Sequence, residues 1–285
     1  MFRKGFMLFV CLLLLLLLPG LSKAEKFGVK LSSGMSYILV GDVNEGVKGV
    51  IDYLRDLSTL YGNSVEGEAK PIHLGFDFEG DIIINLTPRV GIGFGAGYIQ
   101  GAKTSELTVH FPEGQPEASL TFKPKISAIP IRVGVFYTLP VSEMVNVVFN
   151  AGAGMYLANY SYNFRPGRGW SGNSITQTAS AKGFGFHGGV GLEFNLASNI
   201  AFVLEGQGRY AKIGGFEGTA KYDGSSLPYT EEGALYYWEQ MTIIGKYPRV
   251  LVRENKPSGP DVSNAREAKV DFSDFTFLVG IKINF

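Results

Sequence analysis

The sequence predicts an all-β fold, in which antiparallel strands close into a barrel, and three observations support this prediction. The 285 residues include 38 glycines and are 13% aromatic but only 18% charged, a composition that disfavours helices and favours sheets. Apolar side chains recur at every second position through much of the chain, as in strands with one apolar face. The connectors between these segments alternate between short and long.

The N-terminus, before the first predicted strand, has the features of a secretory signal peptide. Arg3 and Lys4 precede an almost unbroken apolar run over residues 6–18, and small residues lead up to Ala24. We therefore predict a cleaved signal peptide over residues 1–24 and one domain over residues 25–285. A membrane-anchoring helix is the alternative, but the run is shorter than the roughly 20 residues that span a bilayer. The single cysteine, Cys11, lies inside this run, so no disulfide is expected in the mature domain.

Eight segments with two-residue alternation are the predicted strands. In the second of them, Phe76 and Phe78 share one face, whereas Asp77 and Glu79 share the other. A tilted strand needs roughly 9–11 residues to cross a membrane, and the segments reach this length. The predicted strands cover residues 27–39, 72–86, 90–98, 129–139, 145–157, 184–196, 200–210 and 275–285.

The connectors are short around residues 86–88, 140–143 and 197–199. They are long over residues 40–71, 102–120, 161–180 and 214–271. Short periplasmic turns and long extracellular loops are typical of outer-membrane barrels. Two long loops are expected to contain helices, over residues 44–61 and, with a weaker pattern, 228–248. These helices are expected to cover the barrel rim; contact with a partner or ligand is the alternative.

The polarity of the two strand faces favours a membrane barrel over a soluble one. In hydrocarbon every backbone polar group must be paired within the protein, and a closed sheet has no free edge. The face opposite the apolar one is rich in glycine with interspersed charges, which suits a narrow interior. A soluble lipocalin-like barrel would instead carry more Lys and Glu outside. We therefore predict an eight-stranded antiparallel up-and-down transmembrane β-barrel in the bacterial outer membrane.

The chain resembles the eight-stranded outer-membrane barrels of the OmpA and opacity-protein type, within the outer membrane protein β-barrel domain family. The resemblance covers residues 27–285 and rests on the signal peptide, the glycine and aromatic repeats, the paired connectors and the C-terminal Phe. It implies that the barrel assembly machinery reads the last strand. Gly280, Ile283 and Phe285 fit such an assembly signal, whereas Leu278 stands where a polar residue is usual.

Charged residues on the inward face form the main candidate site. A buried charge without a partner is very costly, so these residues are expected to pair across the barrel. Because the interior of eight strands is just wide enough for side chains, we predict a polar lumen filled by side chains. A narrow pore whose selectivity these charges set is the alternative. The predicted lumen network comprises Asp77, Glu79, Asp81, Arg89, Arg132, Glu193, Glu205, Arg209 and Lys282.

No catalytic residue, cofactor or metal site is predicted. His73, His110 and His187 are far apart in sequence. A G-x-G-x-x-G motif at residues 183–188 lies within a predicted strand, whereas a dinucleotide site needs it in a turn from strand to helix. Acidic and basic residues number 26 each, so no nucleic-acid partner is indicated.

Together these features predict a monomeric, non-enzymatic outer-membrane protein with a structural or surface-interaction role. Its expected partners are outer-membrane lipid, lipopolysaccharide and the barrel assembly machinery, with an extracellular ligand as a further partner of the loops at residues 40–71 and 214–271. A narrow porin-like channel or small-molecule carrier is the alternative function, and a lipid-modifying enzyme is a more remote one.

Overall fold

The computed structural model describes residues 27–112, 116–170, 172–224 and 227–285. The predicted signal peptide and Cys11 lie outside these residues. The described residues form fifteen strands, all in one antiparallel sheet, and one helix. The elements are β1 (Phe27–Gly41), α2 (Asp42–Leu60), β2 (Ser64–Glu66), β3 (Leu74–Asn85), β4 (Val90–Ala102), β5 (Ser105–His110), β6 (Ala118–Pro140), β7 (Val145–Pro166), β8 (Ser174–Ala197), β9 (Ile200–Tyr210), β10 (Lys212–Ile213), β11 (Glu217–Asp223), β12 (Tyr229–Thr242), β13 (Gly245–Arg253), β14 (Val262–Glu267) and β15 (Val270–Asn284).

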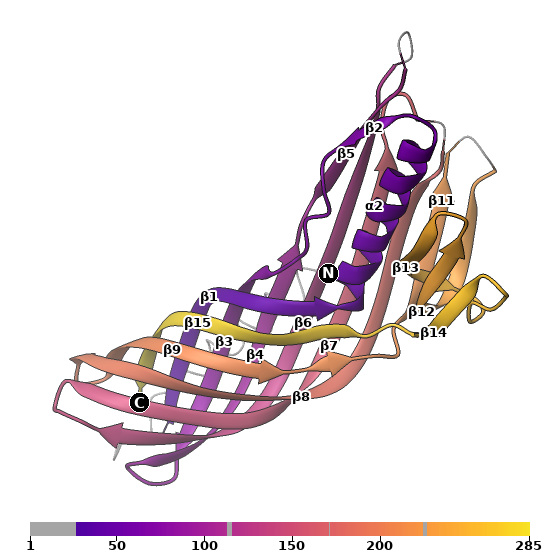
Figure 1. Cartoon of the computed structure of the whole chain (residues 1–285). Helices are drawn as coiled ribbons and strands as arrows, with labels where there is room; N and C mark the ends of the chain where they lie inside the picture. The colour runs from indigo at the N-terminus through magenta and orange to yellow at the C-terminus, as the bar shows by residue number, and fades with distance from the viewer. Residues whose placement is uncertain (1–26, 113–115, 171, 225–226) are drawn as a thin grey trace.

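One part of the sheet closes on itself. Antiparallel pairings run from β1 through β3, β4, β6, β7, β8 and β9 to β15, and β15 pairs again with β1. Strands at the front and back of this part cross at an angle (Figure 1), as the strands of a closed, tilted sheet do. We call it the ring section: β1, β3, β4, β9 and β15 with residues 129–140 of β6, 145–157 of β7 and 182–197 of β8.

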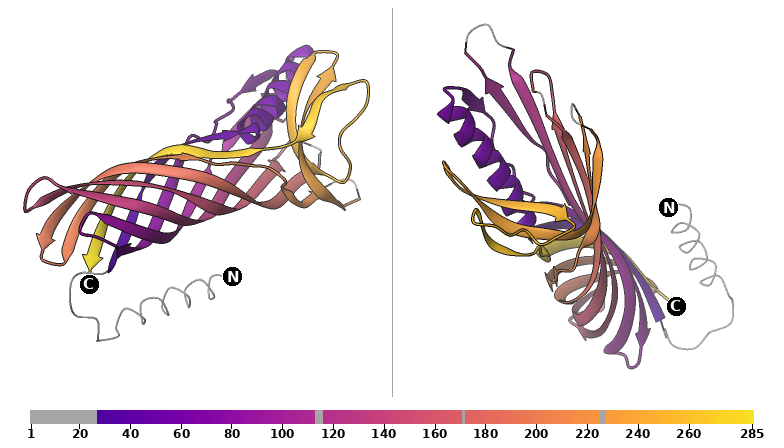
Figure 2. Two further views of the ribbon diagram at one scale, coloured as in Figure 1. Left: turned by 90° about the horizontal axis from the view of Figure 1, so that it is seen from below. Right: turned by 90° about the vertical axis from the view of Figure 1, so that its right-hand side faces the viewer.

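The remaining strands form an extension beyond the ring section. The rest of β6, β7 and β8 rises past the ring, with α2 along one side and β11 to β14 beside it (Figures 1 and 2). We call this part the extension; β2 and β5 also belong to it. The predicted all-β antiparallel fold is therefore confirmed. The prediction of eight strands is not confirmed as it stands, because the sheet has fifteen.

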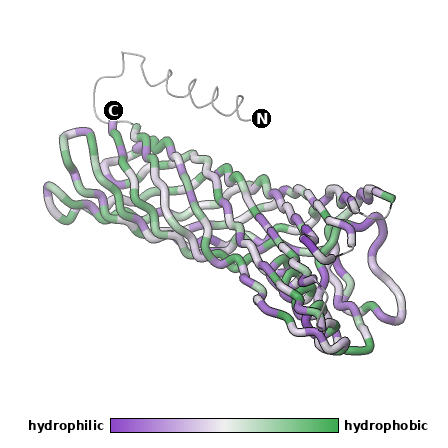
Figure 3. Tube along the Cα trace, turned by 90° about the horizontal axis from the view of Figure 1, so that it is seen from above, coloured by the Kyte–Doolittle hydropathy of each residue, from purple (hydrophilic) through white to green (hydrophobic). Residues whose placement is uncertain are grey.

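Three predicted loops are largely strand. Residues 102–120, 161–180 and 214–271 contain β5, the far ends of β6, β7 and β8, and β11 to β14. The sequence prediction ended the strands too early because the apolar face changes sides. In the ring part of β7, Phe149 is 45% exposed and Asn150 is buried, whereas farther along Asn159 is exposed and Tyr160 is buried. Figure 3 shows the alternation of hydrophilic and hydrophobic residues along the strands.

The first predicted loop helix is confirmed as α2, at Asp42–Leu60. Its apolar residues Val43, Val47 and Ile51 are buried in the core of the extension. Gly46 and Gly49 allow close packing on β13: a Cβ on Gly46 would lie 2.6 Å from the Val250 side chain, and a Cβ on Gly49 would lie 2.2 Å from the Pro248 carbonyl oxygen. Within the described residues, no helix is long and apolar enough to cross a membrane.

The second predicted helix, over residues 228–248, is wrong. These residues form β12 and the start of β13, paired to each other through contacts such as Trp238 opposite Arg249. β12 also pairs with β11 and β14. Its run of Tyr236, Tyr237 and Trp238 has high β propensity, and strand partners on both sides supply the backbone hydrogen bonds that a helix would have supplied itself.

Candidate functional site

Arg209 lies at the centre of a buried ionic network inside the ring section. Its Nη2 lies 2.7 Å from an Asp77 carboxylate oxygen and 3.0 Å from Glu79, and its Nη1 lies 2.9 Å from Asp274. All four side chains have 0% exposure. The geometry follows from the strand period, because successive odd residues of β3 point to the same side of the sheet.

Arg132 and Lys30 extend this network across the interior. Arg132 donates to Glu79 and lies 3.0 Å from Asp81. The Lys30 ammonium lies 3.2 Å from Asp81 and 2.8 Å from Glu205. The network therefore links β1, β3, β6, β9 and β15 through buried charge-assisted hydrogen bonds, which are stronger than neutral ones.

Two amides complete the network. Asn150 donates to Glu205 at 2.8 Å, and the Gln207 amide lies 3.3 Å from Glu205 and 3.4 Å from Glu79. The cations Lys30, Arg132 and Arg209 then face Asp77, Glu79, Asp81, Glu205 and Asp274. Three positive charges against five carboxylates leave a formal excess of two negative charges. Each cation is consequently shared by at least two carboxylates. Loss of Arg209 would leave Asp77 and Asp274 without a cation, and loss of Lys30 would leave Glu205 without one.

Glu193 and Lys282 form a separate ion pair nearer the short turns. The Lys282 ammonium lies 2.9 and 3.0 Å from the two Glu193 carboxylate oxygens. This pair lines a polar cavity of about 570 Å³ at the short-turn end, together with Asn146, Asn195 and Asn284. The cavity forms a vestibule that the sequence did not predict.

Arg89 is the one predicted network residue that the structure places outside the barrel interior. It is exposed, in the turn between β3 and β4. The two-residue alternation of β4 starts only at Val90, so a residue before it has no assigned face. The prediction that Arg89 joins the lumen network is wrong for this reason.

Four members of the network were missing from the predicted set: Lys30, Asp274, Asn150 and Gln207. Lys30 lies between the apolar residues Val29 and Leu31, so the alternation of this strand already indicated that Lys30 is on the inward face. The two amides carry no charge, and nothing in the sequence distinguishes them from other inward polar residues.

An apolar layer lies beyond the ionic network, toward the extension. Ile38, Ile99 and Tyr156 are each 0% exposed and belong to the same core cluster as the apolar side of α2. Gly185 provides space for this layer, since a Cβ there would lie 2.7 Å from the Tyr156 ring. The interior is thus occupied first by paired charges and then by hydrocarbon.

The three histidines are not brought together. His73 stacks on Tyr37 with ring centroids 5.2 Å apart, and His110 Nδ1 lies 2.7 Å from Glu117 in the extension. His187 is half-buried on β8. Among the described residues, no group of His, Cys, Asp or Glu side chains is arranged to hold a metal ion.

The predicted assembly residues lie along the seam between β15 and β1. The Phe285 ring stacks on Phe27 with centroids 4.9 Å apart, and the Phe285 N–H donates to the Phe27 carbonyl at 2.8 Å. A Cβ on Gly280 would lie 2.4 Å from the Leu31 carbonyl oxygen, so glycine permits the close approach of the two strands. Ile283 is 36% exposed on the outer face. Recognition of these residues by an assembly machinery stays a prediction.

Leu278, which departs from the expected polar pattern of the last strand, points inward and is 2% exposed. It lies opposite Gly34 in β1. The absence of a side chain at Gly34 leaves room for its bulk, so the structure accounts for an apolar residue on the polar face.

Comparisons with known proteins identify the family. The model of the outer membrane protein beta-barrel domain matches residues 8–228. Comparison with curated proteins gives no match. A similar solved structure is the outer membrane protease OmpT from Escherichia coli, with 9% identity, 94% of this chain and 99% of that chain covered, and a TM-score of 0.45. Ail, the attachment invasion locus protein of Yersinia pestis, has 12% identity, 91% and 99% coverage, and a TM-score of 0.34.

The translocator domain of the autotransporter NalP from Neisseria meningitidis is also similar, with 12% identity, 94% and 91% coverage, and a TM-score of 0.22. Structural likenesses this weak carry no argument about function. The family match, in contrast, spans more than half of the sequence. The chain therefore belongs to the outer membrane protein β-barrel domain family and is located in the bacterial outer membrane.

Proposed function

We propose that the ring section is an eight-stranded barrel that spans the outer membrane, with the short turns in the periplasm and the extension outside the cell. Large apolar side chains exposed on the outside of the ring support this proposal; Phe94 is 53%, Ile131 47% and Phe277 67% exposed. Such a surface is unfavourable in water and suits lipid. The outward face of the extension, in contrast, carries polar residues such as Lys125 and Asn159.

Protease treatment of whole cells tests this topology. Arg168, in the connection between β7 and β8, and Arg89, in the short turn, are both exposed sites for trypsin. We expect cleavage after Arg168 in intact cells and cleavage after Arg89 only when the outer membrane is permeabilised. Cleavage after Arg89 and protection of Arg168 in intact cells would show the opposite orientation.

We propose that the protein has a structural or surface-interaction role, without catalysis and without conduction of solutes. The observation that supports this role is the filled interior. The ion pairs around Arg209 are fully buried, and the apolar layer containing Tyr156 lies beyond them. A solute would have to displace both layers, and separating buried ion pairs is costly.

Planar-bilayer conductance tests the non-conducting role. We expect no discrete openings at either polarity from the full-length mature protein, with a porin in the same bilayers as the positive control. Discrete openings of the wild-type protein would instead establish the narrow channel. A double variant, Arg209→Ala with Tyr156→Ala, removes one side chain from each layer. If these layers block the passage of ions, the variant is expected to show a higher conductance than the wild-type protein.

The same proposal includes the partners of the two ends of the barrel. The residues at positions 40–71 and 214–271, which include α2 and β12 to β14, offer a surface to an extracellular ligand. The seam at Phe285 is proposed as the site that the assembly machinery reads. Deletion of Phe285 should lower the amount of protein in the outer membrane; an unchanged amount would contradict this.

A further inference from the structure

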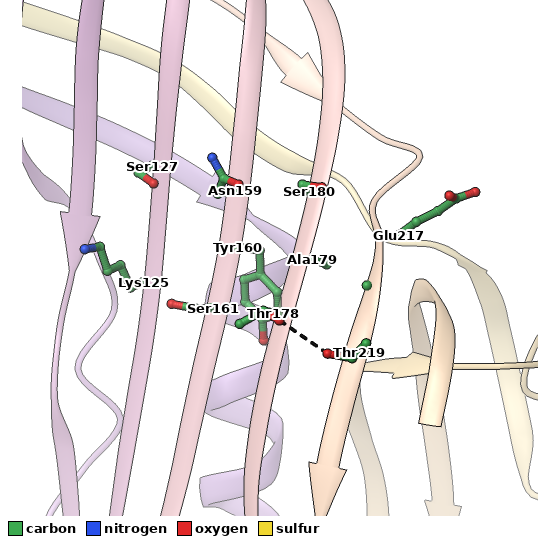
Figure 4. A pocket seen from close by; sticks show the side chains of 11 residues that line it. Lys125, Ser127, Asn159, Tyr160, Ser161, Thr178, Ala179, Ser180, Glu217 and Thr219 are labelled. Carbon is green, nitrogen blue, oxygen red and sulfur yellow. Dashed lines mark hydrogen bonds between the residues drawn. The ribbon is translucent and has the colours of Figure 1, made fainter. Parts of the chain in front are cut away.

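The outward face of the extension carries a regular array of short polar side chains. In one row across four strands, Ser127 lies opposite Asn159, Asn159 opposite Ser180, and Ser180 opposite Glu217. The next row outward runs through Lys125, Ser161, Thr178 and Thr219. We call these two rows the polar grid. Figure 4 shows both rows, on β6, β7, β8 and β11.

The polar grid is slightly hollow and its polar groups are available. A shallow cavity of about 390 Å³ lies over it. The Thr178 and Thr219 hydroxyls lie 3.4 Å apart. In the part of the chain that the structure describes, the side chains of Ser127, Asn159 and Ser161 make no hydrogen bond to another protein group. The hydroxyl and amide groups can therefore donate to and accept from a ligand.

Lysines surround the polar grid without forming ion pairs. Lys123 lies two residues farther from the ring than Lys125 on β6, Lys182 lies two residues closer to the ring than Ser180 on β8, and Lys221 lies on β11. All four ammonium groups belong to exposed residues, and none forms an ion pair within the described ranges. The carboxylates of Glu217 and Asp223 share this face, and Glu232 of β12 lies opposite Thr219, so the four lysines stand against three carboxylates.

The polar grid lies next to the exposed apolar surface of the ring section. The residues one step back toward the ring on the same face are Ile129, Leu157 and Lys182, and Phe184 follows on β8 with 78% exposure. Two residues of a strand span roughly 7 Å. The first polar row therefore begins at the edge of the surface that we propose contacts lipid, and Lys123 lies up to about 20 Å beyond Ile129.

We propose that the polar grid and its lysines bind the sugar and phosphate headgroup of a lipopolysaccharide molecule in the outer leaflet, whose acyl chains lie on the adjoining apolar rows. Ammonium groups pair with phosphates, and hydroxyl and amide groups pair with sugar hydroxyls. The headgroup layer of a phospholipid bilayer is only about 5–8 Å thick on each side. The polar grid and its lysines extend farther from the apolar rows than the thickness of this headgroup layer. Their length therefore fits a lipid whose headgroup bears several sugars. The inference rests on the proposed membrane topology.

Binding of purified lipopolysaccharide to the refolded, full-length mature protein in a zwitterionic detergent tests this inference. The variant Lys125→Gln with Lys182→Gln removes two cations from the face. The control, Lys70→Gln with Lys256→Gln, removes two exposed lysines elsewhere in the long connections. We expect the first variant to bind lipopolysaccharide about tenfold more weakly or worse at low ionic strength, and the control to bind within about twofold of wild type.

A second pair of measurements separates sugar recognition from general attraction to anions. Phosphatidylglycerol should displace labelled lipopolysaccharide poorly, and Ser161→Ala with Thr178→Val should weaken binding of lipopolysaccharide but not of phosphatidylglycerol. Equal displacement by phosphatidylglycerol would overturn recognition of the sugars. Unchanged binding by the lysine variant, in protein that still migrates as a compact unboiled form, would overturn the site. The protease experiment decides the topology separately, so the two failures are distinguishable.

Discussion

The ring section and the extension share three strands but have opposite polarity. Inside the ring, Arg209 and Asp77 are buried among other charges, and the outer face is apolar. Inside the extension, Phe122 and Tyr160 are buried, and the outer face is polar. The strands continue through the change because backbone pairing depends on the two-residue period and not on which face is apolar. In the proposed topology lipid surrounds the ring section and water surrounds the extension, so the outward face is apolar in the first and polar in the second.

The two interiors also differ in how they respond to change. The ionic network has more carboxylates than cations, so its carboxylates depend on cations that they share. The apolar core of the extension has no such dependence and is limited by volume and shape instead. Removing a charge in the ring should therefore be more harmful than a small steric change in the extension.

The largest effect is expected for Arg209→Ala. This change leaves Asp77 and Asp274 without a cation in the ring interior and leaves Glu79 with Arg132 alone. The loss of one partner from a buried ion pair costs about 3–5 kcal/mol. Urea unfolding in detergent micelles, followed on gels by loss of the compact unboiled form, measures this cost. Arg165→Ala, at an exposed arginine of the extension, is the control, and an equal effect of both changes would contradict the importance of the network.

A smaller effect is expected for Gly49→Ala in α2. Alanine is usually better than glycine in a helix by about 1 kcal/mol, but here its Cβ would lie 2.2 Å from the Pro248 carbonyl oxygen. We expect the docking of α2 on β13 to weaken by about 1–3 kcal/mol, with faster hydrogen exchange of α2 amides and an unchanged ring section. Thr59→Ala, at an exposed position of the same helix, should leave exchange almost unchanged. Slower exchange in Gly49→Ala would show that helix propensity outweighs the contact.

The smallest effect concerns the edge of the extension, at Glu239. The Lys246 ammonium, through its hydrogen bond, is the main cause of a lowered pKa of the Glu239 carboxyl, with further hydrogen bonds from Asn264 and Ser263. These contacts connect β12 with β13 and β14. A lowered pKa means that their contribution is present above the ordinary pKa of 4.5 and is lost as the pH falls through the lower folded value.

Hydrogen exchange of β14 amides therefore should become faster below about pH 4.5, after correction for the intrinsic pH dependence of exchange. Glu239→Gln should remove this additional pH dependence, since the amide does not titrate. A wild-type protein and a Gln variant with the same corrected profile would show that other groups hold β14 in place.

Several parts of the fold were predictable from local patterns. The alternation of apolar residues identified the ring strands, and helical spacing of apolar residues identified α2. The inward face of the strands likewise identified Asp77, Glu79, Asp81, Arg132, Glu205 and Arg209 as members of one network. Local patterns carry this information because strand and helix periods fix which side chains share a face.

Other parts required information from distant segments. The prediction for Arg89 was wrong because a residue in a turn is not assigned to either face of the sheet. The helix predicted over residues 228–248 was wrong because β11, β13 and β14 provide strand partners that the local pattern cannot show. The far ends of β6, β7 and β8 were missed because the exchange of apolar and polar faces resembles the end of a strand.

The sequence by itself determined the period-two strands, the inward charges and the apolar outer surface that places the protein in a membrane, because these properties depend on near neighbours in the chain. Only the tertiary structure decided which charges pair, that Lys30 and Asp274 join them, and that the strands continue past the ring around α2. These outcomes depend on residues brought together by sheet closure, and the sheet closes through pairings such as Phe27 with Phe285 that lie far apart in sequence.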